Sequence, residues 1–147
     1  MYHTILVPLD GSRRAERILA HVEDLARVFD SRLVLLSVVE PDLASVGMHG
    51  APAEFYLDAF QRKIDEAEAY LAGLAGELRA RNLQTRALVE RGPVVSTIIG
   101  IAAREAVDLV AMASHGRTGV SRVFYGSVAA GVLHSIDRPL LVVRADD

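Results

Sequence analysis

The chain has 147 residues, a net charge of −3 and no cysteine. A chain of this length suits one domain, residues 1–147, which buries roughly 68–70% of the surface of its unfolded form and needs no cross-link. The lack of cysteine excludes disulfides and thiolate metal sites, and it is compatible with the reducing cytoplasm, where we expect the protein. No basic face indicates nucleic acid, and no apolar run approaches the ~20 residues that would indicate a membrane span.

The first predicted elements are a strand and an amphipathic helix. Thr4–Val7 is a short apolar run with β-branched residues, which is typical of a strand buried on both faces. Ser12 is a predicted N-cap of the helix that follows. The apolar residues of this helix recur at intervals of three and four: Ala15, Ile18, Leu19, Val22, Ala26 and Phe29.

Leu33–Val39 predicts a second buried strand, and Pro41–Pro52 has no periodicity and predicts a loop. One long helix should follow, because its apolar residues step by three and four: Leu57, Phe60, Ile64, Ala67, Leu71, Leu74 and Leu78. This stripe favours packing on the sheet over a coiled coil, for which three heptads are marginal.

The second half repeats the alternation. Gln84–Val89 predicts a weaker strand, and a helix should begin after Gly92 with Pro93 at N1 and an apolar face formed by Val95, Ile98, Ile99, Ala102 and Ala106. Leu109–Met112 and Leu140–Val143 predict two more strands, and the helix between them should begin near Ser127 and point Val128, Val132 and Leu133 inward.

Strands and helices that alternate along the whole chain predict the α/β class. Right-handed crossovers then produce a single doubly wound, five-stranded parallel sheet of order 3-2-1-4-5 with helices on both faces, a Rossmann-like fold. Ligands of such sheets bind beyond the carboxyl ends of the strands, where the strand order reverses. The segments at that point are Pro8–Ser12 after the first strand and Met112–Gly116 after the fourth.

The segment Ala113–Ser127 (ASHGRTGVSRVFYGS) has the composition of an anion-binding loop. Gly126 and Ser127 open a helix, where unpaired N–H groups and the positive end of the helix dipole coincide. Arg117 and Arg122 add cationic donors. Glycine in a loop also serves simple turns, but here we favour phosphate binding over a merely structural loop.

Three observations limit the chemistry. Asp10 follows the first strand and is either a turn-forming acid or an acceptor for a ligand hydroxyl, while His115 in the glycine-bearing loop is a contact residue rather than a catalytic one. Lys63 is the only lysine, so a Walker-type phosphate loop and the lysine of a receiver domain are excluded. No GxGxxG motif follows the first strand, which argues against an ordinary dinucleotide fold.

The run DLVAMASHGRTGVSRVFYGSVAAGVL, with VPLDGS near the start and PLLVV near the end, resembles the universal stress protein family over essentially the whole chain. The nucleotide-binding branch of that family carries G-x-x-G, nine residues, and then G-S or G-T. This chain has Gly116, Gly126 and Ser127 at that spacing, and Ala113 replaces the first glycine.

The resemblance implies an ATP site. Pro8, Leu9 and Asp10 would line the adenine and ribose side, Val38 would contact adenine, and Met112 and Ala113 would border the ribose. The phosphates would be surrounded by Gly116, Arg117, Gly126, Ser127 and Val128, with His115 in the same loop. The resemblance further implies Mg²⁺ or Mn²⁺ carried on the triphosphate, and a homodimer joined through Leu140–Val143, an apolar edge that would otherwise invite uncontrolled pairing.

These expectations describe an ATP-binding universal stress protein that acts with an unknown downstream protein. It would be a nucleotide-dependent stress-response or signalling module, with no contact to nucleic acid or membrane. No residue set satisfies the roles of a strong ATPase, so hydrolysis should be slow or partner-stimulated. One alternative is a dimeric interaction protein of the same fold that binds no nucleotide, and Ala113 favours it. Another is an enzyme of flavin or other small-molecule chemistry, for which the sequence contains no supporting residues.

Overall fold

The structure is a computed structural model, and it describes residues 1–42, 50, 52–115 and 126–145. In this part of the chain, five parallel strands form one sheet of order β3-β2-β1-β4-β5. The predicted class and strand order are therefore confirmed. The strands are β1 (Thr4–Pro8), β2 (Arg32–Val39), β3 (Thr85–Arg91), β4 (Leu109–His115) and β5 (Leu140–Ala145). The predicted loop Pro41–Pro52 falls mostly outside the described residues.

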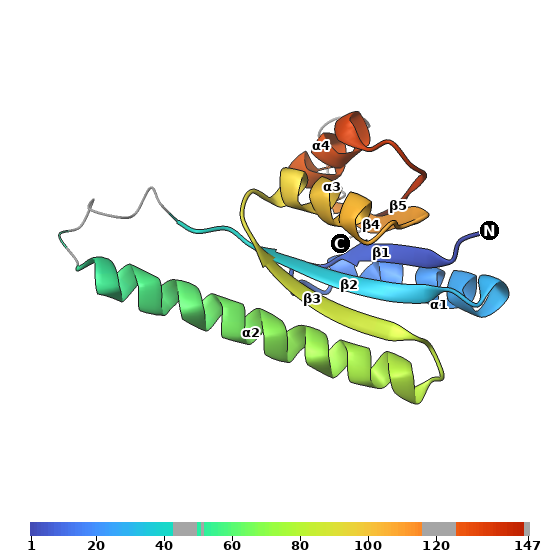
Figure 1. The fold of residues 1–147 in the computed structure, drawn as a ribbon, viewed down its shortest axis with the longest axis horizontal. Coiled ribbons are helices and arrows are strands. Elements are labelled where there is room, and N and C mark those ends of the chain that lie inside the picture. Colours follow the sequence, from blue (N-terminus) through green and yellow to red (C-terminus); the bar gives the residue numbers. More distant parts are fainter. Residues whose placement is uncertain (43–49, 51, 116–125, 146–147) are drawn as a thin grey trace.

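Helices cover both faces of the sheet. A 3₁₀ turn, η1 (Ala15–Arg17), leads into α1 (Ile18–Phe29), and α1 shares one face with α2 (Ala53–Ala80). The helices α3 (Val94–Arg104) and α4 (Ser127–Ser135) cover the opposite face, so that α2 and the α3–α4 pair lie on opposite sides of the strands in Figure 1. None of the helices in the described ranges has the length and apolar composition of a membrane span.

The strands supply side chains to two separate cores. Ile5 and Val7 of β1 pack toward α1 and α2, whereas Leu6 between them packs toward α3 and α4. This alternation follows from the period of two in a strand, and because both faces are covered, all three side chains are fully buried. The continuous apolar runs in the sequence thus reflect burial on two sides.

The chain leaves β1 through a capped turn. Ser12 was predicted as the N-cap, but the N-cap residues are Arg14 for η1 and Arg17 for α1. The Ser12 side chain still contributes, because the Ala15 N–H donates a hydrogen bond to Ser12 Oγ at 3.2 Å. The α-helix itself begins at Ile18. It ends at Phe29, where Asp30 takes a left-handed conformation with φ +53°.

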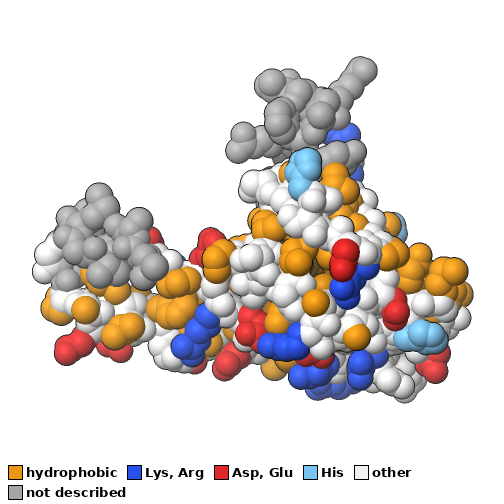
Figure 2. Space-filling view, turned by 45° about the horizontal axis from the view of Figure 1, so that its top comes forward, with side chains coloured by type: hydrophobic (Ala, Val, Ile, Leu, Met, Phe, Trp, Pro, Cys, Tyr) orange, Lys and Arg blue, Asp and Glu red, His pale blue; other side chains and the backbone are white. Residues whose placement is uncertain are grey.

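The predicted long helix exists, but only its C-terminal part packs as expected. Ile64, Leu71 and Leu78 are buried under the sheet, whereas Leu57 is 65% exposed. In Figure 1 the N-terminal part of α2 extends past the strands, and in Figure 2 apolar side chains lie at the surface of this projecting part. The inward placement of Leu57 was therefore wrong, because the stripe continues beyond the end of the sheet that would cover it.

Smaller corrections concern the other helices. Ala106 was predicted on the apolar face of α3, but α3 ends at Arg104 and Ala106 is an exposed left-handed residue with φ +49°. Pro93 is the N-cap residue rather than N1, a difference of one position. Leu133 was predicted to point inward but is 52% exposed, because α4 turns Ala129 and Val132 toward the sheet instead.

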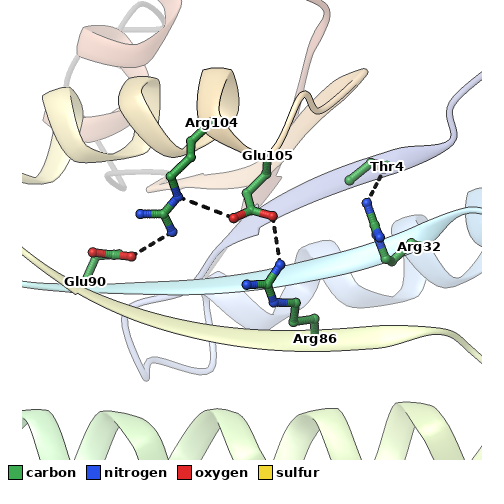
Figure 3. Close-up of polar contacts among 6 residues, drawn as sticks. All are labelled: Thr4, Arg32, Arg86, Glu90, Arg104 and Glu105. Atoms are coloured by element: carbon green, nitrogen blue, oxygen red, sulfur yellow. Dashed lines mark hydrogen bonds and ion pairs between the residues drawn. The ribbon is translucent and has the colours of Figure 1, made fainter.

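Polar contacts tie the C-terminal end of α3 to β3, as Figure 3 shows. Arg86 of β3 pairs with Glu105 at 2.9 Å, and Arg104 pairs with Glu90 of β3 at 2.9 Å and with Glu105 at 3.4 Å. The arginines are half exposed, so each pair adds little on its own. Together they fix which end of α3 lies against β3.

Candidate nucleotide site

A pocket of about 180 Å³ lies at the carboxyl ends of β1 and β4. These strands are direct neighbours, with Ile5 paired with Leu109 and Leu6 with Val110. After β1 the chain turns to the α1 face, and after β4 the next described helix, α4, lies on the opposite face. The divergence of the two connections opens a crevice at the reversal of strand order, where ligands of such sheets bind.

One end of the pocket is apolar. Its walls come from the ends of β1, β2 and β4 and from the α3 side: Pro8, Leu9, Leu36, Val38, Ile98 and Met112. The Leu9 backbone is held by two hydrogen bonds. Its N–H donates to Leu36 O at 2.8 Å, and its carbonyl accepts from Ser37 Oγ at 2.9 Å. Backbone hydrogen bonds to β2 thus fix this apolar wall, and a fixed apolar wall suits the binding of a flat aromatic group.

Asp10 stands at the rim in a tight turn. Its Oδ1 accepts hydrogen bonds from the Ser12 N–H at 2.9 Å and from Ser12 Oγ at 2.5 Å. Gly11 between them has φ +85°, a conformation that favours glycine. The turn-forming role of Asp10 is therefore present, and this exposed residue also lines the pocket.

The start of α4 also lines the pocket. Gly126 is the N-cap residue, with φ +71° and ψ +153°, a combination that only glycine adopts readily. No side chain of the described residues caps this end, so within this part of the chain the N–H groups of the first turn are available to a ligand. Ser127 and Val128 of that turn line the pocket. The positive end of the helix dipole adds to the attraction for an anion.

Ala113 lies in the regular part of β4 and pairs with Val143 of β5. It is not among the described residues with positive φ. The backbone therefore does not require glycine here, and the alanine methyl group is compatible with the strand. Ala113 lines the pocket between Met112 and Ser114.

The structure brings together most of the residues that the sequence singled out. Nine of them line this one pocket: Pro8, Leu9, Asp10, Val38, Met112, Ala113, Gly126, Ser127 and Val128. His115 is the last residue of β4, and its side chain is not described. Gly116, Arg117 and Arg122 lie outside the described residues.

Several pocket residues were not anticipated from the sequence. Arg14 and Ala15 enter from η1, Val94 and Ile98 from α3, and Leu36, Ser114 and Ala129 complete the wall. Among the described residues that line the pocket, Arg14 is the one cation and Asp10 the one acid. The ranges that the structure describes contain no group of three His, Cys, Asp or Glu side chains that could hold a metal ion.

Fold and pocket together define an open α/β protein with a pocket at its topological switch point, where such folds bind ligands. A model of the universal stress protein family matches residues 1–144, and the chain belongs to this family.

Individual relatives cover nearly the whole chain. The universal stress protein MJ0577 of Methanocaldococcus jannaschii is 28% identical over 98% of this chain and 96% of its own length. Its solved structure superposes with a TM-score of 0.83 over 100% of this chain and 99% of that one. A universal stress protein of Thermus aquaticus is 30% identical over 98% of this chain and all of its own. The universal stress protein of Archaeoglobus fulgidus in complex with dAMP shares the fold, with 18% identity and a TM-score of 0.67 over 96% and 97% of the two chains.

Proposed function

We propose that this protein binds ATP in the pocket between β1 and β4. It would act as a nucleotide-dependent stress-response or signalling module of the cytoplasm, with a downstream protein that reads the nucleotide state. The observation that carries the proposal is that the start of α4 at Gly126, which no described side chain caps, lines the same pocket as the apolar ends of β1, β2 and β4. A flat base and an anionic tail on one ligand match these two halves.

The ligand is assigned along the pocket. The adenine would lie between the strand ends, against Pro8, Leu9 and Val38. The ribose would lie beside Met112 and Ala113, with its hydroxyls donating to the Asp10 carboxylate. The phosphates would accept hydrogen bonds from the first turn of α4, at Gly126, Ser127 and Val128. Gly116 and Arg117 are proposed phosphate contacts by resemblance, and His115 is a proposed ligand contact because of its place in the same loop. The dAMP complex of the Archaeoglobus fulgidus protein supports an adenine nucleotide for this fold.

The proposal treats the protein as a switch rather than as a strong ATPase. Mg²⁺ or Mn²⁺ would be bound by the triphosphate itself. Arg14 can neutralise charge, but neither a lysine clamp nor a residue placed as general base is found among the described residues that line the pocket. We therefore expect hydrolysis to be slow unless a partner stimulates it.

Substitutions of Gly126 test the proposal. Gly126→Ala introduces only the strain of an unfavourable φ, whereas Gly126→Asp adds a negative charge where the phosphates would lie. In calorimetric titration with Mg-ATP, we expect Gly126→Ala to bind a few-fold to about tenfold more weakly, the effect of roughly 1 kcal/mol of strain. Gly126→Asp should show no measurable binding.

Thermal unfolding of both variants is the control for the fold. If Gly126→Asp binds Mg-ATP as tightly as Gly126→Ala, the phosphates lie elsewhere. If the unmodified protein binds no nucleotide, the whole proposal is wrong.

A second candidate function is a dimeric interaction protein of the same fold that binds no nucleotide. The observation in its favour is the sheet edge: β5 pairs only with β4 in the described sheet, and its residues Leu140–Val143 are half-buried. Such an apolar edge favours pairing with a second copy. The homodimer is part of both candidates, and nucleotide titration distinguishes them.

A further inference from the structure

A second hollow adjoins the nucleotide pocket. It is a groove of about 670 Å³ between the start of α3 and α4, and it shares Val94, Ser127 and Val128 with the first pocket. The shared residues include the first turn of α4, where the proposed phosphates end. A substituent on the terminal phosphate would therefore leave the nucleotide pocket directly into this groove.

The two helices form the groove because they approach closely. A Cβ placed on Gly131 of α4 would lie 2.7 Å from Val95 Cγ2 of α3, so only a glycine allows this contact. The helices lie next to each other over the sheet in Figure 1. Since both are anchored in one core by Ile98, Ala102 and Val132, the groove is a feature of the packing rather than of a loop.

The lining of the groove selects against further negative charge. Val95 and Ile99 provide apolar surface, and Ser96 and Ser135 add hydroxyl groups. Among the described residues that line the groove, Glu40 is the charged one. The Oε1 atom of Glu40 accepts a hydrogen bond from the Val94 N–H at 3.3 Å. An additional phosphate would be repelled by this carboxylate, whereas an uncharged chain with amide groups could pack on the valine and isoleucine and bond to the serines.

We propose that the groove binds the uncharged arm of an adenine nucleotide whose terminal phosphate carries such an arm, as coenzyme A carries pantetheine. This inference rests on the proposed nucleotide site. It assigns a ligand class different from ATP, because the terminal phosphate of ATP carries no such arm. The adenosine would occupy the first pocket, the phosphates the start of α4, and the arm the space between α3 and α4.

The test compares ADP with dephospho-coenzyme A, which is ADP whose β-phosphate is esterified by pantetheine. Because the ester also removes about one negative charge, the contribution of the groove is the part of the affinity difference in calorimetric titration that a substitution in the groove abolishes. We expect dephospho-coenzyme A to bind at least about tenfold more tightly, the gain from burying a few methylene groups after the cost of ordering the chain.

Two variants locate the effect. Ser96→Trp places a large side chain in the groove from an exposed helix position, and Ala103→Trp places the same side chain at an exposed position of α3 away from the groove. Ser96→Trp should bind ADP normally and lose the advantage of dephospho-coenzyme A, while Ala103→Trp should keep it. Melting temperatures of both variants show that the fold is kept.

Each of the other outcomes contradicts a defined part of the proposal. If ADP binds and dephospho-coenzyme A binds no better, the groove has no such role, and the nucleotide site stands. If Ser96→Trp keeps the advantage, the arm lies outside the groove and the inference is wrong. If neither nucleotide binds the unmodified protein, the proposed function fails together with the inference.

Discussion

The hydroxyl group of Tyr70 is buried and has no hydrogen-bond partner among the described residues. The residue comes from α2 and packs against the core on the α1 side, close to Glu16 of η1 and to Asp10. Burial raises the pKa of the Tyr70 phenol well above its ordinary value, and the negative charges of Glu16 and Asp10 raise it further. The neutral form is therefore strongly preferred in the folded state.

This shift predicts a loss of stability at alkaline pH. A phenol whose pKa is raised on folding contributes stability that is complete below the unfolded pKa, near 10, and is lost as pH rises toward the folded pKa. Between pH 10 and 11.5 the free energy of unfolding should fall more steeply in the native sequence than in Tyr70→Phe, by at most about 1.4 kcal/mol per pH unit. Urea unfolding at a series of pH values measures the difference, and Lys63 adds only one further titrating lysine.

The same variant tests the hydroxyl at pH 8. A buried hydroxyl without a partner costs stability, so Tyr70→Phe should be at least as stable as the native protein there. Tyr2→Phe, at a partly buried position that packs against the same core, is the matched control. A clear loss of stability in Tyr70→Phe at pH 8 would mean that the hydroxyl has a partner after all. Parallel pH curves for Tyr70→Phe and the native protein would contradict the pKa shift.

At the residue scale, the sequence predicted those pocket residues that stand next to a recognisable signal. Asp10 follows an apolar run and precedes a glycine, and Gly126 precedes an apolar helix pattern. Arg14 carries no such signal, because nothing in the sequence distinguishes it from Arg13; the direction of its side chain depends on the 3₁₀ turn after Ser12. Ser114 lies in the predicted segment Met112–Gly116 but was not singled out, because a small polar residue at the end of a strand is typical of a loop.

At the scale of elements, hydrophobic runs identified all five strands but not their ends. The predicted fourth strand stopped at Met112, whereas β4 continues to His115 through pairing of Ser114 with Arg144 of β5. That extension depends on backbone hydrogen bonds to a neighbouring strand, which leave no trace in the hydropathy of the residues. The same limit explains Leu133, because the face that α4 buries is set by its contact with α3 as well as by its own pattern.

The contact between α3 and α4 leads to a prediction about how the helices are positioned. Alanine is normally the better helix former by about 1 kcal/mol, but its Cβ at position 131 would meet Val95 Cγ2 at 2.7 Å. Gly131→Ala should therefore destabilise the protein by about 1–3 kcal/mol, as overpacking does. Urea unfolding measures this, and calorimetry should show weaker Mg-ATP binding because the start of α4 is displaced.

A second substitution shows whether the contact is the cause. Val95→Ala removes the clashing methyl groups, so the double variant with Gly131→Ala should recover most of the loss, with a coupling energy of about 1 kcal/mol or more. Gly100→Ala is the matched control, since a Cβ there meets nothing within 4 Å and should be neutral or stabilising. Additive effects of the two substitutions would show that Gly131 matters for another reason.

At the scale of the whole molecule, the described sheet has two edge strands, β3 and β5. The helix α2 packs against β3, whereas no helix in the described ranges makes comparably extensive contact with β5. Leu133 of α4 exposes apolar surface near the start of the segment that leads to β5. An apolar edge strand and an exposed leucine on the helix that precedes it in the chain together favour the association of two copies through this part of the molecule.

The proposed dimer predicts unequal effects for two exposed leucines. Leu133→Glu would place a charge in the interface and should raise the dimer dissociation constant at least about tenfold, the effect of 1.4 kcal/mol or more of desolvation and repulsion. Leu57→Glu makes the same change on the projecting part of α2, with 65% exposure against 52%, and should leave the constant unchanged. Sedimentation equilibrium over a concentration series measures both variants beside the native protein. A native protein that is monomeric at every concentration would rule out the dimer, and a larger effect from Leu57→Glu would move the interface to α2. Unchanged unfolding curves for both variants would show that the substitutions act on association and not on the fold of the single chain.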